Sequence, residues 1–298
     1  MNLICPLDGE SIVHQQGNYI CESCKTQFPI VDVENREIPD FRCLDRITQT
    51  TLTFTIPQNP LPTIVVDHFG KATSADFQCL SREAIRKKYG TKLDKEILYY
   101  INIAMEQFGK SAYILDLGCG TGGNKKYLNS VGFNNIISVD YRSSEAEFLV
   151  DVHRLPFGKE SFDMILTTAT LEHFYNPYVA FKEMNRVLKT DGILIASGSF
   201  WEKWHGNSCF HFTPGGIDLL CHFSAFELKD MWSGWGFIPS IASHALGLSR
   251  FKKYTYFLQK IFDAILSRIA SPETAKKHKF STSGSFGLFA RKIASNNL

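Results

Sequence analysis

The chain has 298 residues, 44% of them hydrophobic and 21% charged, and a formal net charge of +2. This is the composition of a soluble globular protein, and its apolar runs fall far short of the ~20 residues that a membrane span requires. The start Met-Asn-Leu-Ile-Cys lacks the basic and apolar segments of a secretory signal, and eight scattered cysteines favour a reducing compartment over a disulfide scaffold. We therefore expect a cytoplasmic protein.

The first 42 residues have the spacing of a small metal-binding ribbon. Cys5-Pro-Leu-Asp8 and Cys21-Glu-Ser-Cys24 stand where a zinc ribbon has Cys-x-x-Cys twice. Because a carboxylate also binds zinc, the predicted structural zinc ligands are Cys5, Asp8, Cys21 and Cys24, and His14 is a less well placed substitute. The alternative is a ribbon that has lost its metal and persists as a small β-hairpin packed on the main domain.

Residues 43–92 are expected to form a linker and an N-terminal lid region between this ribbon and a main domain over 93–298. The stretch 43–66 is rich in Thr and Pro, which predicts a linker with one edge strand. A short helix is predicted over 81–89. A clearer helix spans 94–108, with Asp94 as its N-cap, apolar residues along one face and Gly109 at its end.

A glycine-rich turn follows an apolar strand at residues 114–124, which read Ile-Leu-Asp-Leu-Gly-Cys-Gly-Thr-Gly-Gly-Asn. A second apolar run, 136–140, ends in Asp140. Glycines let a ligand approach the backbone closely, and an acid at the tip of the next strand offers two acceptors to a ribose diol. The spacing differs from Gly-x-Gly-x-x-Gly, and no Gly-x-x-x-x-Gly-Lys loop is present, so the pattern favours a nucleoside over a dinucleotide or a cradled triphosphate.

The turn resembles motif I of the class I S-adenosylmethionine-dependent methyltransferases, which is an apolar run, Asp, an apolar residue and Gly-x-Gly-x-Gly. The resemblance continues in order over residues 93–200, through Asp-Val-His-Arg-Leu-Pro-Phe at 151–157 and Leu-Glu-His-Phe-Tyr-Asn-Pro at 171–177. It implies an α/β fold, a Rossmann-like seven-stranded sheet with helices on both faces, and S-adenosyl-L-methionine as cofactor. A zinc-ribbon leader precedes many such enzymes and is related to the small zinc-binding activator of tRNA methyltransferases.

The resemblance also assigns cofactor-binding residues. In the family, the motif I acid lies near the methionine end, the acid at the place of Asp140 holds the ribose, and the acid at the place of Asp151 lies beside the adenine amino group. The full predicted set is Asp116, Gly118, Cys119, Gly120, Gly122, Asp140, Tyr141, Asp151, Val152 and Thr168.

One departure from the usual family pattern concerns the chain between the second and third strands. Ten residues separate Asp140 from Asp151, and a helical crossover needs a dozen or more. We therefore predict a short loop over 141–146 in place of a helix. A compact subgroup with the same shortcut carries a later segment that resembles residues 205–217, in which His211 here takes the place of an arginine and Cys209-Phe210 that of Asp-Tyr.

The remaining elements are predicted from apolar spacing and caps. A helix over 180–189 should end at Asp191-Gly192, with Gly192 as a left-handed cap, and a fifth strand should cover 193–196. A helix begins at Thr213-Pro214 and runs to about His222. Strand six is expected over 235–242 and strand seven over 284–290.

A helical insert at about 250–272 is expected between the last two strands. Its apolar face contains Tyr254, Phe257, Leu258, Ile261, Phe262, Ile265, Leu266 and Ile269. Packing of this face against the domain is the commonest outcome; a substrate lid, a partner surface and peripheral membrane contact are the alternatives. Residues 250–292 hold ten Lys or Arg against two acids, a local charge of +8 that leaves −6 for the rest. This end attracts phosphates, anionic lipid or nucleic acid, or is simply a solvated face.

Methyl transfer needs an acceptor held in line with the cofactor's methyl group, and a base only where the acceptor is a hydroxyl. Candidates near the pocket mouth are Glu172 and the histidines His173, His205 and His211; a structural hydrogen bond is the alternative role for His173. The favoured function is methyl transfer to O or N of a small-molecule or glycan acceptor. A tRNA or rRNA methyltransferase that uses the ribbon and the basic end, and a non-catalytic cofactor-binding scaffold, stay open, as does the oligomeric state.

Overall fold

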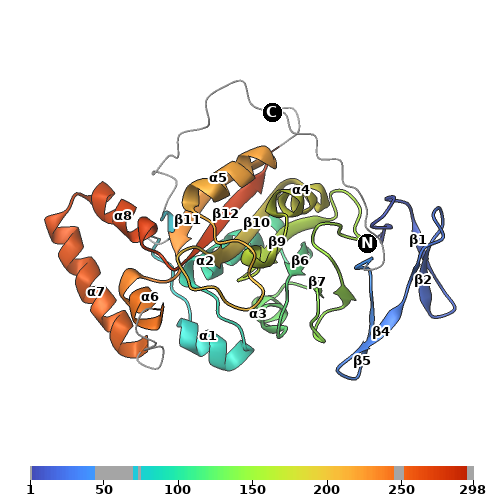
Figure 1. Cartoon of the computed structure of the whole chain (residues 1–298), viewed down its shortest axis with the longest axis horizontal. Coiled ribbons are helices and arrows are strands. Elements are labelled where there is room, and N and C mark those ends of the chain that lie inside the picture. The colour runs from blue at the N-terminus through green and yellow to red at the C-terminus, as the bar shows by residue number, and fades with distance from the viewer. Residues whose placement is uncertain (1, 44–69, 73–74, 245–251, 294–298) are drawn as a thin grey trace.

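The computed structural model describes residues 2–43, 70–72, 75–244 and 252–293 (Figure 1). The predicted linker over 43–66 lies almost wholly outside them. Seven strands form one sheet in the order β11-β12-β10-β9-β6-β7-β8. The sheet strands are β6 (Tyr113–Leu117), β7 (Asn135–Asp140), β8 (Phe148–Leu149), β9 (Phe162–Thr167), β10 (Leu188–Ser199), β11 (Phe226–Ser233) and β12 (Ser285–Lys292). The predicted α/β fold class is confirmed.

The strand directions place the functional edge of the sheet. Strands β8, β7, β6, β9 and β10 run parallel in that order, and β12 runs antiparallel to both β10 and β11. From β6 the chain moves to β7 and β8 on one side and then returns to β9 on the other. The order therefore reverses between β6 and β9, and ligands of such sheets bind at the carboxyl ends of the strands at that point.

Helices cover both faces of the sheet. Helix α2 (Lys95–Phe108) and helix α3 (Gly123–Val131) bury residues such as Ile97 and Leu128 against one face, and α1 (Arg82–Tyr89) contacts α3. Helix α4 (Pro177–Val187) and helix α5 (Pro214–Phe223) bury Phe181 and Ile217 against the other. A short 3₁₀ turn, η3 (Leu171–His173), follows β9.

Local caps explain most helix boundaries. The hydroxyl of Ser81 accepts from the amide of Ala84 at the start of α1, and the hydroxyl of Thr213 accepts from Gly216 at the start of α5. Asp94 occupies the N-cap position of α2 but makes no capping bond; its carboxylate instead lies 3.2 Å from the guanidinium of Arg82. The helices predicted over 81–89, 94–108 and from 213 are thus present.

One predicted element is wrong, and another is present but ends earlier than predicted. Residues 237–244 form helix α6 (Phe237–His244), and strand six is β11. The helix predicted over 180–189 ends at Val187, because the buried Leu188 pairs with Phe162 and already belongs to β10. The left-handed residue beyond it is Asp191, with φ 61°, and Gly192 is not in that conformation.

Between β7 and β8 the chain makes a loop, as predicted. Residues 141–147 are all described and contain no helix. Beyond α6, the predicted helical insert is formed by α7 (Lys252–Ile269) and continues into α8 (Pro272–Ser281), which together project from one end of the molecule (Figure 1). None of the helices in the described part of the chain has both the length and the apolar character to cross a membrane.

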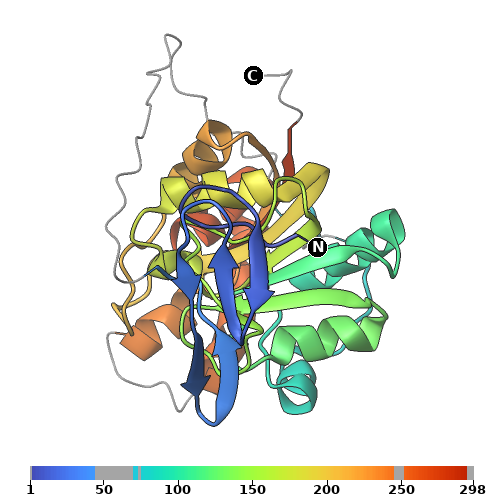
Figure 2. The same ribbon diagram turned by 90° about the vertical axis from the view of Figure 1, so that its right-hand side faces the viewer.

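The N-terminal residues form a small β module beside the sheet edge (Figures 1 and 2). Its strands are β1 (Ile12–Gln15), β2 (Asn18–Cys21), β3 (Gln27–Phe28), β4 (Ile30–Val33) and β5 (Arg36–Pro39). The amide of Phe41 donates to the carbonyl of Leu149 in β8 (2.9 Å), and the amide of Ile4 donates to Pro156 (3.1 Å). Ile38 packs on Cys119, Ala146 and Leu149, so the module touches the loop that follows Asp140.

Candidate functional site

A cavity of about 560 Å³ opens at the carboxyl ends of β6 and β9, where the strand order reverses. This volume lies within the range of small-molecule and cofactor sites. The loops after β6, β7 and β9 supply most of its lining. Of the predicted cofactor residues, it is lined by Gly118, Gly120, Asp140, Tyr141, Asp151, Val152 and Thr168.

The glycine turn forms one wall of this cavity. Gly118 and Gly120 have φ of 73° and 53°, a region that side chains disfavour. A Cβ at Gly118 would lie 2.6 Å from the side chain of Thr170, whereas a Cβ at Gly120 would have no atom within 4 Å. The turn therefore needs glycine at Gly118 for packing, and its backbone at Gly120 is open to a ligand.

Asp140 ends β7 and orders the backbone around the cavity. Its Oδ2 accepts from the amide of Gly120 (3.0 Å), and its Oδ1 accepts from the amides of Arg142 (2.8 Å) and Ser143 (3.1 Å). A carboxylate has about four acceptor positions, so capacity remains for a hydroxyl group. The carboxylate is half-buried and lines the cavity, which suits a ribose diol.

Tyr141, next along this wall, is held from the N-terminal module. The Arg42 guanidinium donates to the carbonyl of Tyr141 (2.9 Å) and lies 5.3 Å from the centre of its ring. Arg42 is itself fixed by Asp40, to which it donates through Nε (2.8 Å) and Nη2 (2.6 Å). Such a paired, planar contact fixes direction as well as position.

Three predicted cofactor residues do not line this cavity: Asp116, Cys119 and Gly122; of these, Cys119 lines a second cavity described below. Asp116 is fully buried and accepts from the Nδ2 of Asn124 (3.0 Å) and the hydroxyl of Ser138 (3.1 Å). Burial raises the pKa of Asp116 to about 6, although both hydrogen bonds act in the opposite direction.

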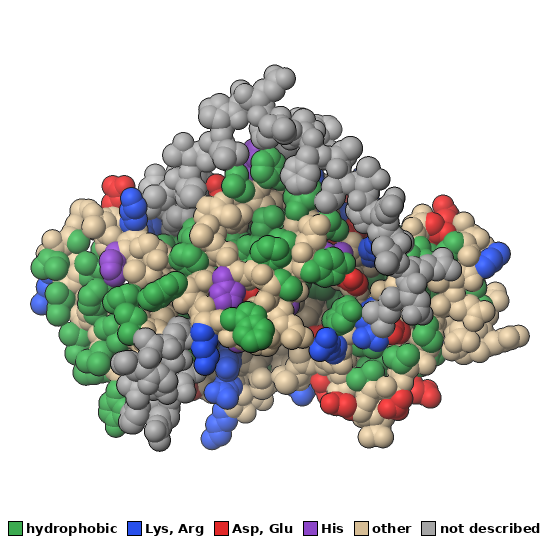
Figure 3. All heavy atoms as spheres, viewed as in Figure 1, with side chains coloured by type: hydrophobic (Ala, Val, Ile, Leu, Met, Phe, Trp, Pro, Cys, Tyr) green, Lys and Arg blue, Asp and Glu red, His purple; other side chains and the backbone are tan. Residues whose placement is uncertain are grey.

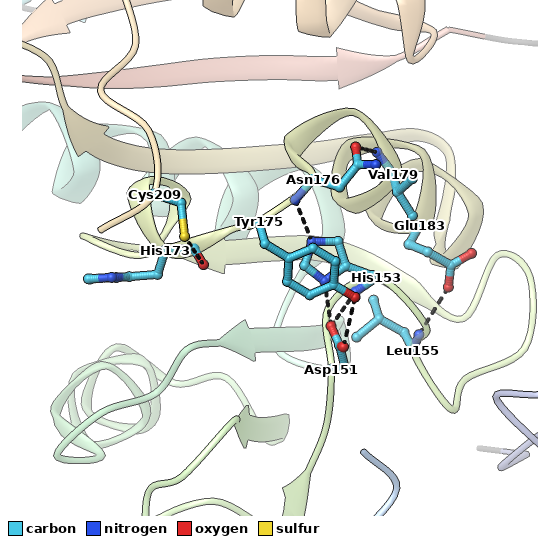
Figure 4. A network of polar contacts seen from close by, with 9 residues as sticks. All are labelled: Asp151, His153, Leu155, His173, Tyr175, Asn176, Val179, Glu183 and Cys209. Atoms are coloured by element: carbon cyan, nitrogen blue, oxygen red, sulfur yellow. Dashed lines mark hydrogen bonds and ion pairs between the residues drawn. The ribbon is translucent and has the colours of Figure 1, made fainter. Parts of the chain in front are cut away.

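A polar network at the far end of the cavity centres on His153, which our sequence analysis did not single out (Figure 4). Its Nε2 accepts from the amide of Asn176 (3.1 Å), so Nδ1 carries the proton and donates to Asp151. Its ring stacks on Tyr175 at 3.7 Å, and the hydroxyl of Tyr175 donates to Asp151 (3.2 Å). Although burial acts to raise the pKa of Asp151, the hydrogen bonds from His153 and Tyr175 outweigh it and lower that pKa. The only sequence signal was the proximity of His153 to Asp151.

The candidate catalytic side chains gather at the other end. His205 Nε2 lies 3.7 Å from Oε1 of Glu172, and the His205 ring lies 6.1 Å from that of His173 and 5.9 Å from that of His211, centre to centre. Glu172 and His205 line a second cavity of about 360 Å³, which shares Gly118, Gly120, Thr168 and Ala169 with the first. Ser199 also belongs here, because its hydroxyl donates to Glu172 (3.0 Å). The predicted histidines are therefore brought together beside the cofactor cavity.

The four predicted metal ligands also converge. Sγ of Cys5 lies 3.8 Å from Sγ of Cys24, and Sγ of Cys21 lies 3.4 Å from both carboxylate oxygens of Asp8. In a tetrahedral site with Zn–S bonds of ~2.3 Å, two sulfur ligands lie about 3.8 Å apart. The amides of Leu7 and Cys24 point at the sulfurs of Cys5 and Cys21 (both 3.4 Å). The described residues therefore fit a zinc ion without large movement, and His14 is not in the group.

Comparison with known proteins identifies the central segment. Residues 115–196 match the model of the methyltransferase domain family. The human mitochondrial arginine-hydroxylase NDUFAF5 is 31% identical over 160 residues, 47% of this chain and 42% of that protein. A malonyl-acyl-carrier-protein O-methyltransferase of Hamiltonella defensa is 24% identical over 128 residues, 39% of this chain and 49% of the enzyme. The chain spans less than half the length of the curated relatives that it matches.

Among solved structures, a SAM-dependent methyltransferase of Methanosarcina mazei is 19% identical, with a TM-score of 0.43 over 65% of this chain and 98% of that one. The strand–turn–strand unit that lines the first cavity lies within the segment that matches the methyltransferase domain model.

Proposed function

We propose that this protein is an S-adenosylmethionine-dependent methyltransferase that acts on O or N of a small-molecule or glycan acceptor. One observation carries the proposal: within a segment that matches a methyltransferase domain, the open backbone of Gly120 and the carboxylate of Asp140 share one wall of a cofactor-sized cavity. When bound, S-adenosylmethionine supplies a methyl group that its sulfonium makes electrophilic. Asp140 would accept from the ribose hydroxyls, and Asp151 would accept from the adenine amino group.

The rest of the site serves to hold an acceptor in line with that methyl group, which can contribute roughly 7–11 kcal/mol to the lowering of the barrier. The second cavity adjoins the first at Gly118 and Thr168 and contains His205 and Glu172. An acceptor there would meet an imidazole and a carboxylate, groups that can take a proton from a hydroxyl. His173 and His211 flank this position.

Calorimetric titration with S-adenosylhomocysteine tests the proposal. We expect one binding site per chain and release of S-adenosylhomocysteine when S-adenosylmethionine and an acceptor are supplied together. Mass spectrometry of ligands that co-purify with the protein would identify the acceptor. Absence of S-adenosylhomocysteine binding would remove the proposal, and binding without turnover on any co-purified acceptor would favour a scaffold.

A tRNA or rRNA acceptor is the second candidate, supported by the charge of +8 over residues 250–292. A gel-shift with bulk tRNA separates the two. A shift that weakens steeply with salt would favour RNA, and no shift at low salt would remove this candidate.

We also propose that Cys5, Asp8, Cys21 and Cys24 hold a structural zinc ion, supported by the tetrahedral spacing of their sulfurs. A small module of this size has little core of its own, and structural zinc can contribute roughly 10–16 kcal/mol to folding. Metal analysis of the purified protein should give about one zinc per chain, and none in a Cys21→Ser, Cys24→Ser double variant. A value below about half an equivalent in the parent would contradict the proposal.

A further inference from the structure

Glu172 is a buried carboxylate with too few hydrogen-bond donors. It is 2% exposed, and its Oε2 has no hydrogen-bond partner among the described residues. Its Oε1 accepts from Ser199 Oγ at 3.0 Å, but Ser199 Oγ also lies 2.8 Å from Oε2 of Glu202. A hydroxyl has one proton, so it can serve only one of these carboxylates. Buried charge of this kind requires a nearby positive charge.

His205 faces this carboxylate in an orientation that suits a metal ligand. Its Nδ1 lies 3.1 Å from the carbonyl oxygen of Lys203, and a carbonyl only accepts, so Nδ1 carries the proton. In the neutral ring, Nε2 then has a lone pair, 3.7 Å from Oε1 of Glu172. This separation is close enough for one cation to bind both atoms. An N–H bond to a backbone carbonyl is also how metal-binding histidines are usually held.

His173 supplies a third ligand from the same turn as Glu172. One ligand atom from each of Glu172, His173 and His205 lies within 4.8 Å of the others. Figure 4 shows His173 extending away from the Asp151–His153–Tyr175 network, so it is not engaged there. A metal with bonds of ~2.0–2.2 Å requires closer ligands, and the partly exposed rings of His173 and His205 can rotate toward Glu172.

We propose that Glu172, His173 and His205 bind a divalent transition-metal cation at the junction of the two cavities. Two imidazoles and one carboxylate leave coordination positions open, as in metal sites that bind substrate. The open positions would face the second cavity and take an oxygen or nitrogen of the acceptor. The cation site stands on the geometry alone; only its use as an acceptor anchor rests on the proposed methyl transfer.

Titration of the full chain with Mn²⁺, followed by the electron paramagnetic resonance signal of free Mn²⁺, tests the site. Mn²⁺ favours oxygen ligands such as the Glu172 carboxylate over thiolates, so the cysteine cluster should not interfere. We expect one Mn²⁺ per chain, with affinity reduced at least about tenfold in each of Glu172→Gln, His173→Ala and His205→Ala. The exposed residues Glu227 and His222 provide matched controls, Glu227→Gln and His222→Ala, which should bind as the parent does.

Two results would overturn the proposal. If the full chain leaves the free Mn²⁺ signal unchanged, the positive charge beside Glu172 is a proton on His205. If the site variants bind Mn²⁺ like the parent, the ion lies elsewhere. His173→Ala changes an exposed side chain, so it stays informative even if Glu172→Gln fails to fold. Binding of S-adenosylhomocysteine by the metal-free chain is measured separately and tests the proposed function alone.

A different observation concerns α7, whose apolar side faces away from the protein. Gln259 is 9% exposed, and its Oε1 accepts from the amide of Ile238 in α6 (2.8 Å). Thr255 is 8% exposed. The large apolar side chains that are 43–78% exposed are Tyr254, Phe257, Leu258, Ile261, Ile265 and Ile269. The expected packing of this face against the domain is therefore wrong, and hydrophobic side chains gather over α7 in Figure 3.

The net charge of α7 and α8 indicates which kind of partner covers the apolar face of α7. Residues 252–281 contain seven Lys or Arg against two acids, a net charge of +5. A second copy of the chain would bring two such charges together, whereas an anionic lipid surface attracts each basic residue by about 1 kcal/mol. We infer that α7 and α8 dock on the surface of an anionic membrane, with the apolar side chains of α7 at the level of the headgroups.

Docking of α7 and α8 on the membrane would also place the acceptor cavity near the lipid. Trp201 stacks on Phe237 of α6 at 6.1 Å, and Phe237 lies 6.3 Å from Phe262 of α7, centre to centre. Trp201 and Trp204 are 50% and 73% exposed in the same loop as His205. If the proposed function holds, the acceptor is then presented from the membrane surface.

Co-sedimentation of the full chain with vesicles tests this inference. We expect binding to vesicles of phosphatidylcholine with phosphatidylserine, little binding to phosphatidylcholine alone, and at least about tenfold weaker binding of Phe257→Glu and Ile261→Glu. Val131→Glu, on the partly exposed last residue of α3, is the matched control. Equal sedimentation of parent and α7 variants would overturn the inference, as would a stable dimer that only the α7 variants dissociate. Neither readout depends on cofactor binding.

Discussion

Asp140 combines ligand binding with the ordering of its own loop. Its carboxylate accepts from three backbone amides, of Gly120, Arg142 and Ser143, before any ligand is present. Loss of the carboxylate would therefore remove the ribose contact and also release the glycine turn. The two effects are separable, because an amide keeps one acceptor oxygen and the size of the side chain.

We expect Asp140→Ala to weaken S-adenosylhomocysteine binding at least about tenfold, since charge-assisted hydrogen bonds contribute roughly 1.5–3 kcal/mol each. Asp140→Asn should lose less. Asp76→Ala, at an exposed acid outside both cavities, is the control and should bind like the parent. Calorimetry gives all four affinities; an unchanged value for Asp140→Ala would contradict the assignment of the ribose site.

Asp116 gives a prediction about pH. Its pKa is about 6 in the folded chain, against an ordinary value of 3.8 for an aspartic acid. Between about pH 4 and 6 the folded state therefore holds a proton on Asp116 that the unfolded state has largely lost. The free energy of unfolding should therefore fall as pH rises through this window, by about 2–3 kcal/mol for this residue. In Asp116→Asn this fall should be absent, because an amide does not titrate in this pH range, and the fold should be kept because the amide can still bond with Asn124 and Ser138.

Denaturant unfolding of parent and Asp116→Asn at pH 4 and pH 7 measures this difference. The variant should be close to the parent at pH 4 and more stable at pH 7. A parallel fall in stability for both proteins would show that Asp116 is not the titrating group.

Among the elements, the loop over 141–147 depends on the N-terminal module. It takes the place of a crossover helix, and its first residue, Tyr141, is held by the guanidinium of Arg42. We expect Arg42→Ala to weaken cofactor binding several-fold without unfolding the main domain, because the hydrogen bond to the Tyr141 carbonyl and the contact with its ring are lost, together with two hydrogen bonds to Asp40. Arg86→Ala, at an exposed position of α1, is the control in the same calorimetric assay. Equal affinities would show that the loop holds its shape unaided.

The elements also show what sequence could and could not predict. The strand, glycine turn and second strand around Asp116 and Asp140 were predictable because strong local patterns specify them. Strand β11 was missed because Asp230 occupies a buried position and breaks the apolar alternation. Besides the adjacent amide of Met231, that acid accepts from partners far away in the sequence: the amides of Lys71 and Ala72 and the hydroxyl of Tyr100.

Helix α6 was taken for a strand because Phe, Ile and Trp favour strands, yet its apolar residues also repeat at helical spacing and pack on α7. The contact between Glu172, Ser199 and His205 was harder still to predict from the sequence. Glu172 follows β9, Ser199 is the last residue of β10 and His205 follows it, so only the pairing of these two strands brings them together. Neither their contact nor the unpartnered oxygen of Glu172 has a signal in the sequence.

At the scale of the whole molecule, the module and the cofactor cavity should behave as coupled units. If zinc organises Cys5, Asp8, Cys21 and Cys24, its removal frees the segment that ends in Asp40, Phe41 and Arg42. We therefore expect a chelator to lower both the melting temperature and the affinity for S-adenosylhomocysteine, and zinc to restore both. The Cys21→Ser, Cys24→Ser variant should resemble the chelated parent and not respond to zinc. An unaltered affinity for S-adenosylhomocysteine after complete zinc removal would show that the module and the cofactor cavity are not coupled.

The contact between the module and β8 has a further consequence. β8 is the last strand of its sheet, and an uncovered last strand offers its free amides and carbonyls to other chains. Here Asp40 and Phe41 occupy that position beside Leu149, and the ring of Phe41 lies 5.8 Å from that of Phe148. By covering β8, the module prevents this edge strand from pairing with the same strand of another molecule. A chain shortened to begin after residue 43 should therefore precipitate at concentrations at which the full chain stays in solution.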